Sequence, residues 1–377
     1  MIIYWSMVLW VPLIYFVYSL GHKEEVMLTD YNIQQGIRKK IPIAYAIVVF
    51  GYFIFWIGMR KYVADTKAYI SGFEAIPTDF STAWSQIDWE GKSPGFDIFN
   101  IIFKCFISQD YQWWLMTIAI ISGVCIMVVL RKYSCSFFYS AFLFMTMLTF
   151  TWMMNGMRQF ICVAFLFLFC DWIKDGKFIK FLILVLVMST IHTTALLMIP
   201  IYFVARSKPW DKKIGLFIIG IILICVFAEP FFNGVESALT GTAYEGSTEQ
   251  FKEDDGVNPI RVLFYAVPPI IAFVFRQKLE PYYEKNPIIP ICVNMSLITA
   301  ALYLVGVFTS GILIGRLPIY CEVYNLILIP YLLHCCFDKE TGRTVRIVYT
   351  VVLLVFLHLM LLQQLSYYHS DLTGIIK

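Results

Sequence analysis

Apolar runs of about 16 to 22 residues dominate the chain, and this is the length that crosses a hydrocarbon core of roughly 30 Å as an α-helix. Hydrophobic residues make up 59% of the 377 residues and charged residues only 15%, against roughly 25% charged in soluble proteins. The sequence therefore predicts an all-α polytopic membrane protein with a single integral membrane domain over 1–377. We place the runs at 2–20, 41–59, 113–130, 136–153, 157–172, 214–231, 261–276, 288–308, 316–336 and 346–365.

The topology depends on a further apolar stretch, 178–204, which six polar or β-branched residues at 189–194 interrupt. Its length fits either one tilted helix or a hairpin of two half-helices. With a hairpin, 19 of the 29 lysines and arginines lie in cytoplasmic loops and 10 lie outside; with a single pass the numbers become 13 and 16. Because the single pass contradicts the positive-inside rule, we predict a broken hairpin, about 11–12 transmembrane segments and outward-facing termini.

Two predicted outer loops are too long to be simple connectors. The loop 60–112 is rich in tryptophan and contains a short apolar piece at 98–108, which we expect to form an interfacial helix. The loop 233–260 is acidic. Loops of this size are usually functional or disordered.

Four arginines, Arg60, Arg158, Arg261 and Arg316, fall at the predicted outer ends of spans. The positive-inside bias should remove arginine from these positions, and a guanidinium near hydrocarbon costs several kcal/mol unless it is paired. Guanidinium groups bind phosphate oxygens bidentately. The four arginines therefore predict a pyrophosphate site; the alternative for each is an anchor to lipid headgroups or a partner for an outer carboxylate such as Asp65 or Glu322.

Two residues are candidates for a general base. His192 is predicted to lie mid-membrane, among hydroxyl side chains at the hairpin break. Asp65 lies one helical turn from Tyr69 just beyond the second span, so we expect both side chains to face the same cavity as Arg60. The alternatives are a hydrogen-bonded structural histidine and a carboxylate that only balances the arginine charge.

The sequence disfavours an energy-coupled transporter and a nucleotide-sugar enzyme with a cytoplasmic catalytic domain, because the chain lacks the motifs of these two classes. We find no nucleotide-binding loop, nucleophile elbow or zinc-ligand pair, and the ten cysteines have no ligand-like spacing. We therefore expect no cofactor, no metal and no nucleic-acid partner. Without a nucleotide site, the substrate must already be carried by the membrane.

Five short motifs occur in order along the chain, four at predicted outer membrane ends and one, Ser-Pro-Gly-Phe, in the outer loop before the third span. They are Gly58-Met59-Arg60 with Ala64-Asp65-Thr66 and Tyr69; Ser-Pro-Gly-Phe at 93–96; Asn155-Gly156-Met157-Arg158-Gln159; Ile191-His192-Thr193-Thr194-Ala195-Leu196; and Gly315-Arg316 with Tyr320. Together they resemble the EpsG family of Wzy-type polysaccharide polymerases over nearly the whole chain.

The resemblance implies a GT-C-like fold and a glycosyltransferase of the bacterial cytoplasmic membrane with an outward-facing active site. Such an enzyme joins oligosaccharide repeat units carried on undecaprenyl pyrophosphate, in exopolysaccharide, capsule or O-antigen synthesis. Its partners are the lipid-linked donor and acceptor and membrane lipid, with a chain-length regulator and a flippase as candidates. The implied roles are pyrophosphate binding for Arg158 and Arg316 assisted by Arg60 and Arg261, substrate-cavity lining for Tyr69, Gln159 and Tyr320, and proton acceptance for His192 or Asp65.

Two other classes also handle lipid-linked or glycan substrates in membranes. A lipid-linked oligosaccharide flippase would show cations through the membrane depth and two similar halves, whereas this chain has arginines at one face and no evident repeat. A membrane glycan O-acyltransferase would use His192 as base, yet nothing in the sequence marks a path for an acyl donor.

Overall fold

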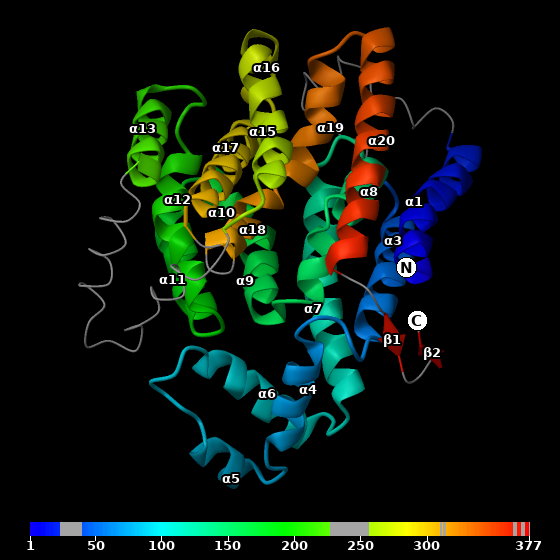
Figure 1. Ribbon diagram of the computed structural model, residues 1–377, viewed down its shortest axis with the longest axis vertical. Coiled ribbons are helices and arrows are strands. Elements are labelled where there is room, and N and C mark those ends of the chain that lie inside the picture. The colour runs from blue at the N-terminus through cyan, green and yellow to red at the C-terminus, as the bar shows by residue number, and fades with distance from the viewer. Residues whose placement is uncertain are drawn as a thin grey trace.

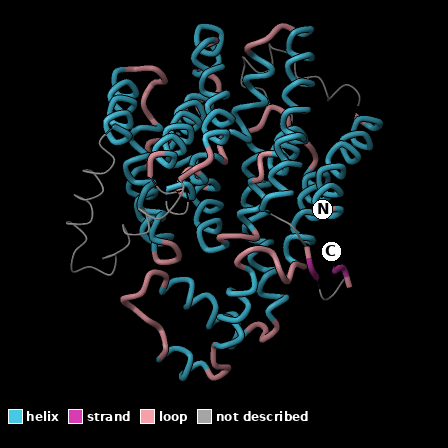
Figure 2. The backbone as a smooth tube through the Cα atoms, viewed as in Figure 1, coloured by secondary structure: helices cyan, strands magenta, loops and turns pink. Residues whose placement is uncertain are grey.

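Helices form nearly all of the regular structure in the computed structural model, which describes residues 1–22, 40–226, 256–309, 311, 314–364, 368–370 and 374–376. The strands described are the two-residue antiparallel pair β1 (His369–Ser370) and β2 (Ile375–Ile376) near the C-terminus (Figure 2). The all-α fold predicted from the apolar runs is thus confirmed. The predicted loop 233–260 lies outside the described residues except at its end.

The bundle is built from long and short helices that lie side by side (Figure 1). Its α-helices are α1 (Ile2–Gly21), α3 (Ile43–Gly58), α7 (Tyr111–Tyr133), α8 (Phe137–Thr146), α9 (Met157–Leu168), α10 (Cys170–Lys174), α11 (Phe178–Ser189), α12 (Met198–Ala205), α13 (Lys212–Val226), α15 (Pro259–Val274), α16 (Arg276–Tyr283), α17 (Ile288–Val307), α18 (Ile319–Glu322), α19 (Asn325–Cys335) and α20 (Lys339–Gln364). The 3₁₀ turns are η1 (Thr149–Met153), η2 (Thr193–Leu197) and η4 (Ile314–Arg316).

Among the described residues, four helices are long and apolar enough to cross a membrane, or six when two bent pairs are each taken as one span. Five further apolar helices have 10–17 residues. The full-length segments are therefore fewer than the predicted 11–12, because several apolar runs are broken or bent. The four are Ile2–Gly21, Tyr111–Tyr133, Ile288–Val307 and Glu340–Leu362; the pairs are Pro259–Val274 with Arg276–Tyr283 and Ile314–Glu322 with Asn325–Cys335.

Large apolar side chains on the outside of the bundle support a lipid environment. Helix α20 exposes about half of several valine and isoleucine side chains, and α13 exposes 70% of Leu216. Such contiguous apolar surface is not found on monomeric soluble proteins.

The predicted hairpin is confirmed. The ring of Phe178, at the start of α11, lies 5.1 Å from that of Tyr202 and 4.9 Å from that of Phe203, near the end of α12. The segment therefore enters and leaves at the same end of the bundle, and residues 190–193 form its turn at the other end (Figure 1).

Contacts between the basic loops also agree with the hairpin. The guanidinium of Arg206 lies against Gly176. This contact connects the loop before the hairpin with the loop after it. Lys208 pairs with Glu280 at 2.6 Å, and the Lys278 ammonium donates to the Cys336 carbonyl at 3.0 Å. The loops predicted to be cytoplasmic therefore meet at one end, called here the basic end.

Residues 60–110 form a lobe at the opposite end of the bundle (Figure 1). The lobe contains α4 (Thr66–Ala75), α5 (Phe80–Ser85) and α6 (Pro94–Phe106). The apolar piece predicted at 98–108 is helical, as part of α6, and packs with Phe73 and Trp114 through Phe96 and Phe103. Its place at a membrane interface stays a prediction.

Candidate functional site

Arg60 follows α3 and is completely buried, with 0% of its surface exposed. Its Nε donates to Thr66 Oγ1 at 3.0 Å, and Nη2 contacts Met157 Sδ. Tyr4 and Tyr368, from the two ends of the chain, interact with it electrostatically. Because its contacts are with the protein, we assign Arg60 a structural role in place of the predicted help with pyrophosphate.

The start of α9 presents Arg158. Gly156 precedes the helix with φ of +79°, a left-handed conformation that glycine adopts without steric cost. Arg158 Nη1 donates to Ser93 Oγ at 2.8 Å. Its guanidinium lies 5.7 Å from the ring centre of Tyr69 and 5.9 Å from that of Phe96, so one fixed rotamer satisfies both cation–π contacts and the hydrogen bond.

The segment 93–96 attaches the lobe to the turn of the hairpin. Gly95 N donates to Thr190 O at 2.8 Å. A Cβ atom on Gly95 would lie 2.2 Å from Thr190 Oγ1 and 2.9 Å from Thr190 Cβ. Only glycine permits this approach, and Ser93 on the same segment holds Arg158. The Ser-Pro-Gly-Phe motif therefore fixes the lobe, Arg158 and the His192 turn relative to one another.

We predict that Gly95→Ala lowers activity about 10²-fold, because a displacement of about 1 Å in a preorganised site has that cost. Rotation of the Thr190 hydroxyl does not relieve the contact, since Thr190 Cβ is also within 2.9 Å. The measurement is polymer formed per unit of protein. Gly51→Ala on α3 is the control, because its Cβ meets nothing within 4 Å; equal activity in the two variants would contradict the prediction.

His192 lies at the turn between α11 and η2. Its Nδ1 is 2.7 Å from Thr194 Oγ1, which is 3.0 Å from the Tyr320 hydroxyl. Tyr320 is 2% exposed and is linked to the histidine through Thr194. Its predicted place in the substrate cavity stays a prediction. Arg158 and Arg316 both act electrostatically on the imidazole.

Arg316 is exposed at the end of η4. The side chain of Gln159, 2% exposed, donates from Nε2 to the Arg316 carbonyl at 3.0 Å. Gln159 thus joins the backbone of η4 to α9, and its predicted place in the substrate cavity stays a prediction. The neighbouring Gly315 packs closely on Val257, since a Cβ added to Gly315 would lie 2.8 Å from Val257 Cγ2. Within the described part of the chain, the Arg316 guanidinium makes no hydrogen bond or ion pair, so it is available to a ligand.

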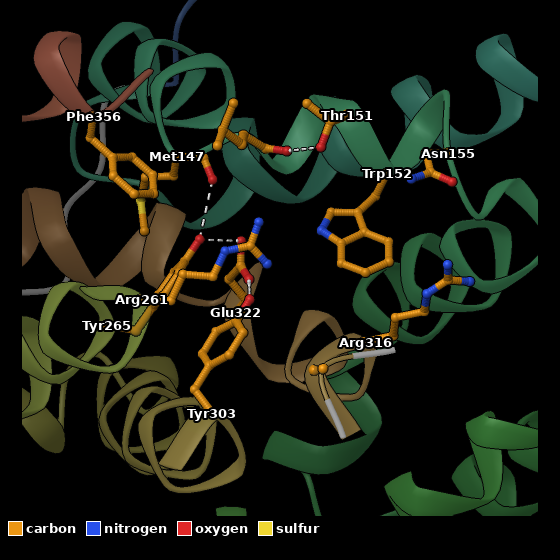
Figure 3. Close-up of a pocket in the computed structure, with 13 residues that line it drawn as sticks. Met147, Thr151, Trp152, Asn155, Arg261, Tyr265, Tyr303, Arg316, Glu322 and Phe356 are labelled. Atoms are coloured by element: carbon orange, nitrogen blue, oxygen red, sulfur yellow. Dashed lines mark hydrogen bonds between the residues drawn. The ribbon is translucent and has the colours of Figure 1, made fainter. Parts of the chain in front are cut away.

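Arg316 and Arg261 line one cavity of about 370 Å³, called here the central cavity. Figure 3 shows Trp152 between the two arginines, with Asn155 on the Arg316 side. Asn155 Oδ1 is buried and has no hydrogen-bond partner among the described residues. Two guanidinium groups around one cavity suit an anion with several oxygens.

Glu322 lies on the inner wall of the central cavity and is 1% exposed. It accepts hydrogen bonds from the Tyr265 hydroxyl at 2.8 Å and the Tyr303 hydroxyl at 2.7 Å, and Arg261 interacts with it electrostatically (Figure 3). The sequence predicts for Glu322 only the role of a partner for an arginine. Its position as the one acidic residue in the predicted span 316–336 also indicates a functional role, because ionisable residues inside membrane spans are costly.

We predict that Glu322→Leu destabilises the protein, because the Tyr303 hydroxyl loses its acceptor and Arg261 loses its electrostatic interaction with the Glu322 carboxyl group. Each buried donor left unsatisfied costs about 1–3 kcal/mol. A thermal melt of the purified protein in detergent is the measurement. Glu322→Gln keeps an acceptor of the same shape and should melt close to the unmodified protein. A melting temperature unchanged in Glu322→Leu would show that the network contributes no stability.

A second cavity of about 420 Å³, called here the lobe cavity, opens between α4, α6 and Arg158. The predicted pair Asp65 and Tyr69 lines it, together with Asp97 and Asn100, which sequence reasoning missed. Burial raises the pKa of Asp97, and the Arg158 charge acts in the opposite direction. Asp65 is exposed and lies in this cavity rather than beside Arg60.

The structure therefore brings together three of the four predicted arginines. Arg158 and Arg316 act on His192 from the lobe cavity and the central cavity respectively, and Arg261 shares the central cavity with Arg316. Arg60 lies behind Arg158, against Met157. Among the described residues, no group of three or more His, Cys, Asp or Glu side chains is placed to hold a metal ion.

The match to a family model decides the classification. The model of the EpsG family matches residues 43–371, which include all five motifs. The chain belongs to the EpsG family. EpsG is a family of Wzy-type polymerases, so the chain is a membrane protein of polysaccharide biosynthesis. None of the curated proteins and none of the solved structures matches it.

Proposed function

We propose that this EpsG-family protein polymerises oligosaccharide repeat units carried on undecaprenyl pyrophosphate, within a GT-C-like fold. The observation that carries the proposal is the grouping of Arg158, His192 and Arg316 at one end of an apolar bundle. A cationic site of this kind suits a lipid pyrophosphate that lies at the membrane surface, because guanidinium groups bind phosphate oxygens and stay charged.

The reaction joins a donor chain to an acceptor repeat unit. The oxygen of an acceptor hydroxyl forms a bond to the anomeric carbon of the donor, and the bond from that carbon to the pyrophosphate oxygen breaks. Undecaprenyl pyrophosphate leaves with the electron pair. Arg158 and Arg316, held by Ser93 and by Gln159, stabilise the charge that develops on it, and Arg261 extends the positive surface into the central cavity.

The proton of the acceptor hydroxyl goes to His192 in this proposal. With Nδ1–H donating to Thr194 Oγ1, Nε2 carries the lone pair that a general base needs. Asp65 is the second candidate, and it lines the lobe cavity together with Arg158. The electrostatic interaction of His192 with both Arg158 and Arg316 favours the histidine.

The site faces outward in this proposal, because the basic end of the bundle is cytoplasmic by the positive-inside rule.

We predict that an impermeant maleimide labels Ser71→Cys on α4 in intact cells and does not label Ser207→Cys at the basic end. Cys105 and Cys225 are the partly exposed native cysteines, the other eight being buried, so both are first replaced by serine. Permeabilised cells supply the positive control, and labelling of Ser207→Cys in intact cells would reverse the orientation.

Cells that lack the chain test the proposed function in vivo. The proposal expects single lipid-linked repeat units to accumulate and polymer to disappear, with both effects reversed when the chain is restored. The units should accumulate at the outer face, where an added glycosidase reaches them. If they accumulate only inside, the chain acts as a flippase and the proposal is wrong.

A further inference from the structure

We infer that the lobe cavity is a saccharide subsite, which binds an uncharged or amino sugar ring of the lipid-linked substrate. The inference rests on the proposed function and adds the class of ligand and its place. The cavity has about 420 Å³, within the range of roughly 300–1,000 Å³ for small-molecule sites. It is formed by α4 and α6 of the lobe together with Arg158, which also interacts electrostatically with His192.

Aromatic rings form part of the cavity wall. Tyr69, Phe73 and Phe96 line it, with the Tyr69 and Phe96 ring centres 6.3 Å apart and tilted at 76°. The C–H face of a pyranose ring is apolar and packs on such aromatic faces, while its hydroxyl groups remain at the ring edge. Phe73 and Phe96 are 1% and 4% exposed and support the wall from behind, so the half-buried Tyr69 is the ring that offers a face to one side of a sugar.

Hydrogen-bonding groups line the same cavity. Asp65 and Asp97 supply carboxyl oxygens, each able to accept from two sugar hydroxyls. Asn100 Oδ1 accepts from Trp114 Nε1 at 3.0 Å, and this bond fixes the amide so that its NH₂ group remains to donate. Acceptors, a donor and aromatic faces together form the usual set for a polyhydroxylated ring.

The charges narrow the class of sugar. Two carboxyl groups and one guanidinium line the cavity, and the guanidinium is already held by Ser93 and two rings. Like charges that face each other in an interface cost several kcal/mol. Pyrophosphate and acidic sugars are therefore disfavoured here, whereas the central cavity with its two arginines suits the pyrophosphate.

Gly72 offers a way to fill the cavity without disturbing the lobe. It lines the cavity on α4, and a Cβ added there meets no atom within 4 Å, so Gly72→Leu places a side chain in open space. Ser71→Leu makes the same kind of change one residue away on the same helix, at an exposed position outside the cavity lining. Asp97→Asn is a second variant, which keeps the shape of the side chain and removes its charge.

The experiment measures binding by the purified full-length protein in detergent. The probes are the free repeat-unit oligosaccharide, released by mild acid from the lipid-linked pool of the host, and undecaprenyl pyrophosphate without sugar. We expect Gly72→Leu to weaken saccharide binding by about tenfold or more, equivalent to about 1.4 kcal/mol, and Asp97→Asn to weaken it by a smaller factor. Undecaprenyl pyrophosphate should bind equally to all variants, and Ser71→Leu should bind both probes normally.

Four outcomes would overturn the inference. Unchanged saccharide affinity in Gly72→Leu would place the sugar elsewhere. Loss of undecaprenyl pyrophosphate binding in Gly72→Leu and Asp97→Asn would make the lobe cavity a pyrophosphate site. If the unmodified protein binds undecaprenyl pyrophosphate but no saccharide, the subsite is wrong while the proposed function stands; if it binds neither probe, both are wrong.

Discussion

Replacement of Arg158 or Arg316 by lysine is expected to lower polymer formation by about 10²-fold or more while the protein still inserts at normal abundance. Loss of one donor aimed at a developing negative charge typically costs about 10²–10³ in rate. Lysine keeps the charge but loses the planar fork that binds two phosphate oxygens. Arg158 also loses the hydrogen bond from Nη1 to Ser93 that orients it.

The measurement is polymer length and amount, normalised to the protein in the membrane. Arg276→Lys is the matched control, because Arg276 lies at the basic end and its guanidinium contacts only Phe273 among the described residues. Near-normal polymer in both Arg158→Lys and Arg316→Lys would mean that these arginines serve as surface anchors. Arg60→Lys should instead lower abundance, since Arg60 is fully buried against the protein.

His192→Ala should abolish most turnover and leave the binding of undecaprenyl pyrophosphate intact. A general base contributes about 10² to 10⁴ in rate, so a small residual activity is expected. The hydrogen bond between Thr194 and the buried Tyr320 does not involve the imidazole, so the variant keeps this link in the hairpin turn. The expected effect of His192→Ala is therefore on proton transfer and not on the fold of the hairpin. Turnover under single-cycle conditions and equilibrium binding are the two measurements.

His192→Gln separates a base from a structural histidine. Glutamine can keep a hydrogen bond to Thr194 Oγ1 but cannot accept a proton at neutral pH. The proposal expects His192→Gln to be as inactive as His192→Ala. If glutamine restores the polymer that alanine abolishes, His192 is a structural residue of the turn, and the proton acceptor must be sought at Asp65.

The membrane fold and the hairpin could be predicted from the sequence because each depends on a sum over many residues. The apolar runs need only length and composition, and the hairpin follows from the distribution of 29 basic residues between two sides. Contacts such as Phe178 with Phe203 and Arg206 with Gly176 then agree with that prediction. Neither depends on the position of a single side chain.

One of the two bends could not be predicted. The chain turns by 80° between α15 and α16, at the predicted end of the span 261–276, and by 56° between Ile314–Glu322 and Asn325–Cys335, inside the predicted span 316–336. The second bend lies at Val323-Tyr324, where no glycine or proline marks a break. Its geometry is set by packing against other helices, including the bonds from Tyr265 and Tyr303 to Glu322.

Individual roles at the site were the least predictable. Arg60 and Arg316 look alike in the sequence, since each follows a glycine-containing motif at the end of a span. Arg60 is nevertheless buried by Tyr4 and Tyr368 from the two ends of the chain, whereas Arg316 is exposed. Long-range contacts of this kind decide whether a side chain meets protein or ligand, and no local pattern contains them.

The most direct test of the proposed function uses the purified protein alone in detergent or liposomes, with the lipid-linked repeat unit of its host and no nucleotide. Mass spectrometry of the lipid-linked products is the measurement. The proposal predicts a ladder of two, three and more repeat units on undecaprenyl pyrophosphate, together with one free undecaprenyl pyrophosphate for each bond formed. Repeat units that remain single, with no undecaprenyl pyrophosphate released although the protein binds them, would contradict it.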